Sequence, residues 1–123
     1  MYIRGIRGAT TVNHNQESDI LQETKVLLET IIRKNNLQID DIASIFFSVT
    51  QDLDAAFPAK AARDLGLTTT PLLCLREIPV KLSLNKCIRV LLHVNTAKKQ
   101  IDMTHVYLNE AANLRPDHAA GSL

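Results

Sequence analysis

Apolar residues recur at helical spacing between residues 16 and 34, and this is the clearest periodic pattern in the chain. Ile, Leu and Thr occupy one side of this stretch, while charged residues occupy the other. Such a stripe predicts an amphipathic helix with one buried face. The polar run Asn13-His14-Asn15 before it offers N-cap chemistry, and Asn35-Asn36 after it suits a left-handed C-cap.

The other regular elements are predicted to be shorter. A second helix is expected over residues 58–65, because Pro58 suits a first helical position and Gly66 suits a helix end. Runs of β-branched and apolar residues predict the strands. These strands are expected over residues 2–10, 45–50, 72–78, 86–96 and 103–109.

About five strands, two main helices and no clean βαβ repeat predict an α+β, or mixed α/β, domain with a mixed sheet. The length of 123 residues fits one domain, which we place at residues 1–115. A flexible C-terminal tail is expected at residues 116–123. So few helices leave strands half covered, which suggests that partner subunits close the core of a compact homo-oligomer.

Composition excludes several classes of function. A net charge of +1 and an aromatic content of 4% argue against a nucleic-acid binder, which needs clustered basic charge or stacking rings. No run approaches the roughly 18 apolar residues of a membrane span, and the amino terminus has no signal-peptide pattern. Cys74 and Cys87 form no CxxC pair and the histidines lack metal-ligand spacing, so we expect no metal and a cytoplasmic location.

Arg7 and Arg89 stand inside apolar strand-like runs, with no acid beside either in the sequence. An unpaired guanidinium in a dry interior costs several kcal/mol, so each needs an anion, either a carboxylate elsewhere in the fold or a bound ligand. A guanidinium fork matches a carboxylate. The pattern therefore indicates a pocket for a dianionic, hydroxylated small molecule, with further polar candidates in Lys60, Arg63, Cys74, Glu77, Tyr107 and Arg115.

These residues also have simpler interpretations. Arg89 is compatible with a solvent-facing position on an edge strand, and residues 60–64 with one solvated helix face. Cys74 is compatible with a small core residue, and Glu77 with a weak surface ion pair to its neighbour. Tyr107 fits an ordinary exposed strand face.

Motifs for covalent, metal or cofactor chemistry are missing from the sequence. There is no G-x-S-x-G elbow, P-loop, dinucleotide fingerprint or H-E-x-x-H pair. An arginine-rich pocket without these motifs indicates binding alone, or catalysis by positioning and electrostatics.

Five motifs, in order along the chain, resemble those of the monofunctional AroH-type chorismate mutases. They are IRGIRGATTV at residues 3–12, AFPAKAAR at 56–63, CIRV at 87–90, HVYL at 105–108 and LRPD at 114–117. The resemblance implies the Claisen rearrangement of chorismate to prephenate in phenylalanine and tyrosine biosynthesis. It also implies a chorismate-mutase-like fold that assembles as a homotrimeric pseudo-α/β-barrel, with active sites at subunit interfaces and no cofactor or covalent intermediate.

The same resemblance implies roles for individual residues. Arg7 and Tyr107 would hold a substrate carboxylate, Arg89 would lie against the ether oxygen, and Glu77 and Cys74 would bind the ring hydroxyl. The wider substrate-binding set implied by the family is Phe57, Ala59, Lys60, Arg63, Leu72, Leu73, Leu75, Arg76, Leu114 and Arg115. Strict alternation would place Cys74 and Glu77 on opposite faces of one strand, so a bulge or a site at the strand end has to bring them together.

Two other functions stay open. A Rid-type imine deaminase shares a similar trimeric architecture and binds carboxylates with arginine, but does not need Glu77, Arg89 and Tyr107 together. A non-catalytic trimeric sensor of an anionic metabolite would bind chorismate without consuming it. Chorismate turnover separates these alternatives.

Overall fold

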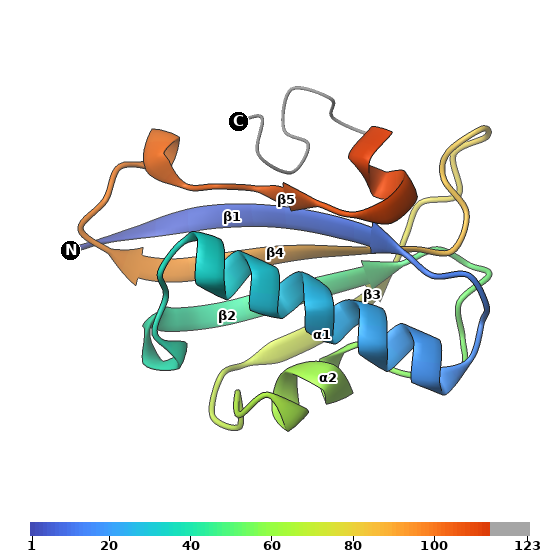
Figure 1. Ribbon diagram of the computed structural model, residues 1–123, viewed down its shortest axis with the longest axis horizontal. Helices are drawn as coiled ribbons and strands as arrows, with labels where there is room; N and C mark the ends of the chain where they lie inside the picture. Colours follow the sequence, from blue (N-terminus) through green and yellow to red (C-terminus); the bar gives the residue numbers. More distant parts are fainter. Residues whose placement is uncertain (114–123) are drawn as a thin grey trace.

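Five strands form one mixed sheet that carries two helices on one face (Figure 1). The computed structural model describes residues 1–113. The strands are β1 (Tyr2–Thr11), β2 (Ile42–Val49), β3 (Leu72–Arg76), β4 (Cys87–Thr96) and β5 (Val106–Tyr107). The helices are α1 (Glu17–Lys34) and α2 (Ala59–Asp64), with short 3-10 helices η1 (Ile39–Asp41), η2 (Gln100–Asp102) and η3 (Asn109–Asn113). The predicted mixed sheet with two main helices is therefore confirmed.

The strand order is β3-β2-β4-β1-β5, which places β4 in the middle of the sheet. β4 pairs antiparallel with β1 and with β2. The outer strands are parallel to their neighbours: β3 pairs with β2, and β5 pairs with β1. Arg89 on β4 stands opposite Ala9 on β1 and Ser48 on β2. The interpretation of Arg89 as an edge-strand residue is therefore wrong, because its strand is paired along both sides.

The hydrophobic core lies between the sheet and its two helices. α1 contributes its predicted apolar stripe, and β4 contributes the residues that alternate with Arg89. At Gly8 the helix comes so close that an added Cβ would lie 2.8 Å from the Ile31 side chain. The central core residues are Ile6, Leu27, Leu28, Ile31, Ile45, Phe47, Ala62, Leu92 and Val94.

The helix ends differ in how well the sequence predicted them. Asn36 has φ +52° after α1 and Gly66 has φ +103° after α2, so both left-handed stops are confirmed. The predicted N-cap of α1 is wrong: Gln16 occupies the N-cap position and makes no side-chain cap bond. Asn15 instead bonds to a distant loop, where its Oδ1 accepts from the backbone N–H of Asp54 at 3.1 Å.

The last predicted strand is much shorter than residues 103–109, because only Val106–Tyr107 pairs with β1. Asn109 has φ +54°, which ends the extended backbone, and its side chain bonds to Thr11 and Glu23. β3 likewise ends at Arg76 rather than at residue 78. The expected domain boundary and tail, together with Leu114 and Arg115, lie outside the described residues.

We call the sheet face turned away from the helices the open face. Several apolar side chains on it remain accessible in the single chain; Leu73 and Leu75 are each about half exposed. Following the alternation of the strands, this face carries Ile3, Arg7, Ala9, Ser44, Phe46, Ser48, Leu73, Leu75, Cys87, Arg89, Leu91, His93 and Tyr107.

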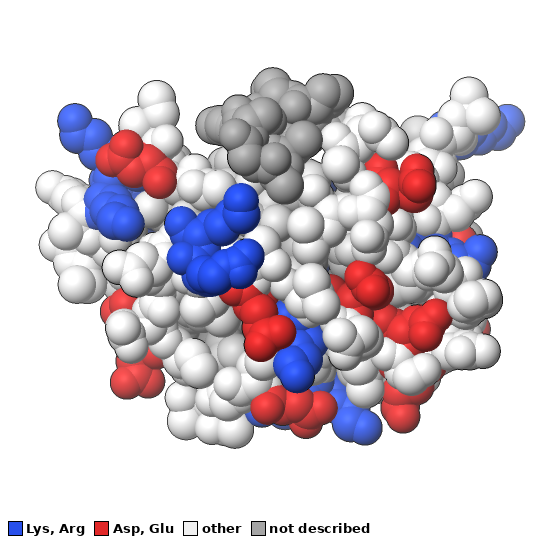
Figure 2. Space-filling view, in the orientation of Figure 1, with Lys and Arg blue, Asp and Glu red and all other residues white. Residues whose placement is uncertain are grey.

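Charge is mixed on the helix-bearing side of the molecule. Figure 2 shows acidic and basic residues interspersed there, so neither sign covers that side alone. Within residues 1–113, no helix is both long and apolar enough to cross a membrane.

Candidate active site

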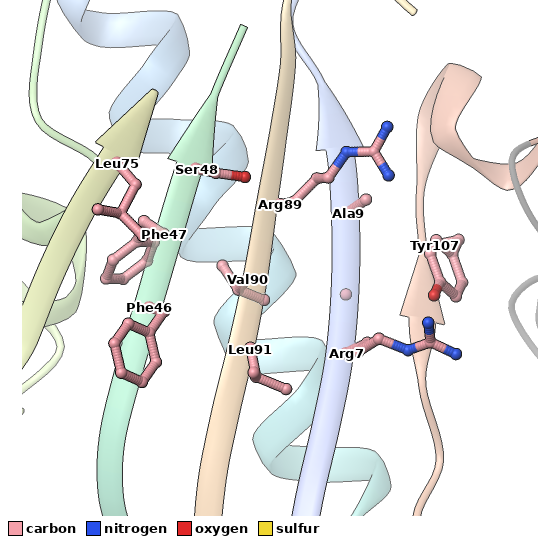
Figure 3. Close-up of a pocket in the computed structure, with 11 residues that line it drawn as sticks. Arg7, Ala9, Phe46, Phe47, Ser48, Leu75, Arg89, Val90, Leu91 and Tyr107 are labelled. Atoms are coloured by element: carbon pink, nitrogen blue, oxygen red, sulfur yellow. The ribbon is translucent and has the colours of Figure 1, made fainter. Parts of the chain in front are cut away.

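A hollow of about 330 Å³ on the open face brings the two strand arginines together. Figure 3 shows Arg7 reaching from β1 toward Tyr107 on β5, while Arg89 reaches from β4 across β1 beside Ala9. We call this the arginine hollow. It is lined by Arg7, Gly8, Ala9, Phe46, Phe47, Ser48, Leu75, Arg89, Val90, Leu91 and Tyr107.

Arg89 has a single carboxylate neighbour among the described residues. Its Nε lies 3.5 Å from Oε2 of Glu77, which is within ion-pair range. That Nε is buried and has no hydrogen-bond partner within residues 1–113, so its contact with Glu77 is an ion pair without a hydrogen bond. Arg89 is therefore only loosely neutralised, and its guanidinium remains available for another anion.

Glu77 is held by two bonds just beyond the end of β3. Its backbone N–H donates to the carbonyl of Val49 at 2.8 Å, and its Oε2 accepts from the Ser48 hydroxyl at 2.6 Å. The predicted surface pair with Arg76 is wrong. Arg76 donates instead to the backbone carbonyl of Gln51 at 3.0 Å, because its side chain points to the opposite face.

Cys74 and Glu77 remain on opposite faces of the sheet within one chain. β2 and β3 pair without a register shift, and Cys74 stands opposite Phe47, a core residue beneath the helices. The bulge considered from the sequence is therefore absent from this pairing. One chain does not bring the Cys74 thiol to the Glu77 carboxylate.

Arg7 is exposed, and no carboxylate pairs with it in the described part of the chain. Its backbone N–H donates to Nδ1 of His105 at 2.9 Å, which fixes the strand beside β5. Tyr107 is only 5% exposed, so its interpretation as part of an exposed strand face is wrong. It is buried because it packs in a small cluster with Ala9, Cys87 and Ala111.

A second hollow, of about 520 Å³, lies beside the N-termini of the two helices and along β3. We call it the helix-side hollow. Lys60 on α2 makes a long 3.9 Å contact with Glu17, and both side chains are at least half exposed, so this pair contributes little. The residues that line the helix-side hollow include Phe57, Lys60, Arg63, Cys74, Leu75 and Arg76.

The expected site residues thus fall into two groups. The arginine hollow holds Arg7, Leu75, Arg89 and Tyr107, with Glu77 beside Arg89. The helix-side hollow holds Phe57, Lys60, Arg63, Cys74 and Arg76, and Leu75 borders both hollows. Ala59, Leu72 and Leu73 line neither hollow. Ser48 was missed from the sequence, although its alternation with Phe47 on β2 places it on the same face as Arg89.

Cys87 is a buried thiol next to the arginine hollow. Burial raises its pKa from 9.0 to about 11, although the guanidinium of Arg89 acts in the opposite direction by favouring the thiolate. The carboxylates of Glu77 and Asp52 add to the increase in pKa. Cys87 therefore stays a neutral thiol in the folded protein near neutral pH.

This shift predicts a loss of stability at high pH. A pKa that is higher in the folded state gives stability that is present below pH 9 and is lost as pH rises toward 11. The loss should approach about 2–3 kcal/mol for Cys87. Urea unfolding at pH 8 and 10.5 should show a larger decrease in midpoint for the wild type than for Cys87→Ala. Parallel decreases in the two proteins would contradict the assignment to Cys87.

The fold and the site together define a class: a small α+β protein with two arginines converging on one face of its sheet. The chain matches the family model "Chorismate mutase type I" over residues 3–118. It belongs to the type I chorismate mutases, and it converts chorismate to prephenate in aromatic amino-acid biosynthesis. This decides against the imine deaminase and the non-catalytic sensor.

Individual relatives agree with the family match. The chain is 49% identical to chorismate mutase AroH of Bacillus subtilis (strain 168), over 95% of this chain and 93% of that one. It is 47% identical to chorismate mutase AroH of Thermus thermophilus, over 94% and 95% respectively. A solved chorismate mutase from Clostridium thermocellum superimposes with a TM-score of 0.87 at 57% identity, covering 89% of this chain and 97% of that one.

Proposed function

We propose that the arginine hollow binds chorismate, with Arg7 and Tyr107 on a carboxylate and Arg89 against the ether oxygen. The observation that carries this assignment is that Arg7 and Arg89 enter one hollow (Figure 3), and that Glu77 is the single carboxylate paired with either of them within residues 1–113. Two guanidinium groups and one carboxylate leave an excess of positive charge. A dianionic substrate complements that excess, and in this proposal Glu77 would accept a hydrogen bond from the ring hydroxyl of the substrate.

The proposed mechanism uses position and charge alone. The enolpyruvyl side chain of chorismate has to fold over the ring, and binding a carboxylate at Arg7 selects that reactive conformer. As the ether C–O bond breaks, negative charge grows on the oxygen beside Arg89. A guanidinium already in place stabilises this charge mainly in the transition state, so it raises kcat rather than only tightening binding.

We further propose that each active site is completed by a second copy of the chain. The arginine hollow lies on the open face, whereas Cys74 in the helix-side hollow lies on the other face, so one chain cannot close both around one ligand. Joining two different surfaces is a head-to-tail contact, and such contacts form a closed ring when the rotation between successive copies closes. The exposed Leu73 and Leu75 on the open face would be covered in such a homotrimer.

The proposed mechanism predicts a chemical step that needs neither metal nor proton transfer. Chorismate loss and prephenate formation should proceed at the same rate before and after metal chelation. Single-turnover rates should vary little between about pH 6 and 8, because no general acid or base takes part. A bell-shaped dependence of the chemical step in this range would contradict the mechanism, while sedimentation of the same sample tests the trimer.

A cytoplasmic location stays a prediction. Cys74 and Cys87 are both free thiols, which suits a reducing compartment.

A further inference from the structure

Ser48 makes the shortest polar contact to the carboxylate beside Arg89. Its hydroxyl donates to Oε2 of Glu77 at 2.6 Å, and the same oxygen lies 3.5 Å from Nε of Arg89. Ser48 and Arg89 are register partners on adjacent strands, and Figure 3 shows the Ser48 hydroxyl pointing toward β4. One carboxylate oxygen is thus shared between a short hydrogen bond and a longer ionic contact.

This hydrogen bond is not needed to hold the chain in place. The backbone N–H of Glu77 already donates to Val49, continuing the β2–β3 pairing by one residue past the strand end. The side-chain bond therefore acts on the carboxylate rather than on the backbone. Its effect is to keep that carboxylate at the Nε edge of Arg89.

We propose that Ser48 is a positioning residue that keeps Glu77 from closing onto the outer end of Arg89. A carboxylate and a guanidinium prefer a two-bond fork, which is the strongest geometry open to this pair. That fork would occupy the guanidinium nitrogens that a substrate anion requires. Because Oε2 is engaged by Ser48, Arg89 stays loosely paired and its outer nitrogens remain available to the substrate. The buried Nε of Arg89 then has no hydrogen bond within the described residues.

The inference rests on the proposed roles of Arg89 and Glu77, and it makes a specific kinetic prediction. Without the hydroxyl, substrate has to displace Glu77 from Arg89, so KM should rise while kcat changes less. Losing a hydrogen bond to a charged group at this half-buried position should raise KM for chorismate by about 10-fold. The affinity for the product prephenate, measured by calorimetry, should fall by a similar factor.

The sharpest comparison is Ser48→Thr against Ser48→Val in the full-length chain. Threonine and valine have nearly the same shape and both suit a strand, but only threonine keeps the hydroxyl. We expect Ser48→Thr to keep a KM near the wild-type value and Ser48→Val to show the increase. Ser44→Ala is the matched control, because Ser44 lies on the same strand and face but its hydroxyl bonds to His93 at 3.1 Å.

A double mutant tests whether the effect passes through Glu77. In a Glu77→Ala background, Ser48→Val should produce no further change in prephenate affinity, because the carboxylate it positions is gone. Equal KM values for Ser48→Val and Ser48→Thr, or an undiminished effect in the Glu77→Ala background, would overturn the inference. Near-normal turnover of Arg89→Ala would instead overturn the proposed function, so the two failures are distinguishable.

Discussion

Replacing Arg89 by alanine is expected to lower kcat for chorismate by about 10²–10³, since it removes the donor beside the developing charge. Arg89 stands on the central strand and lines the arginine hollow, so in the proposed site its guanidinium is already present before the reaction begins. Binding should weaken less, because Arg7 would still hold a carboxylate. Steady-state kinetics with chorismate, together with prephenate calorimetry, would measure both effects.

Two further variants make the Arg89 experiment specific. Arg89→Lys keeps the positive charge but loses the planar fork, so it should recover only part of the activity. Arg33→Ala removes an exposed arginine from the last turn of α1 and should leave kcat unchanged. If Arg89→Ala retained near-normal kcat in a folded oligomer, the proposed role of Arg89 would be wrong.

Mixing two inactive variants should restore activity if each site combines two copies of the chain. Arg89→Ala damages the arginine hollow, and a double variant of Lys60 and Arg63 to alanine damages the helix-side hollow. In trimers reassembled from an equal mixture, about one quarter of the interfaces should join two intact hollows. The mixture should therefore regain about a quarter of the wild-type rate, from parents that are nearly inactive.

The same experiment has a clear negative outcome. If both hollows of one chain served one substrate, every site in the mixture would carry a defect and no activity would return. Each variant reassembled alone is the control for the dissociation step, and sedimentation confirms that mixed oligomers have formed. A rate no higher than that of the two parents would reject the shared site.

Local patterns in the sequence predicted the elements that depend on neighbours along the chain. The apolar stripe over residues 16–34 predicted α1 to within one residue, and the apolar run over residues 86–96 predicted β4 equally closely. The left-handed stops at Asn36 and Gly66 were also predictable. In each case the information lies in a short stretch of neighbouring residues, because side-chain periodicity and backbone sterics are local properties.

Features that depend on distant partners were not predictable. Asn15 was expected to cap a helix, but a loop close in space and distant in sequence offers it two backbone N–H donors. Tyr107 alternates with polar residues, yet η3 and the start of β4 bury it. Ser48 has no motif around it and gains importance only from Glu77, which lies 29 residues away.

From the residue pattern alone it follows that Arg7 and Arg89 stand in apolar strand-like runs, and that either of them needs an anion if the fold buries it, because a buried unpaired guanidinium is costly. The structure leaves Arg7 exposed and Arg89 partly buried, so this cost applies to Arg89. The residue pattern also placed Cys74 and Glu77 on opposite sides of a strand, because side chains alternate there. The side of the sheet that the helices cover and the central position of β4 follow from the three-dimensional packing, which brings Arg7 and Arg89 together on the open face. Strand order and helix placement arise from long-range packing, which no local pattern encodes.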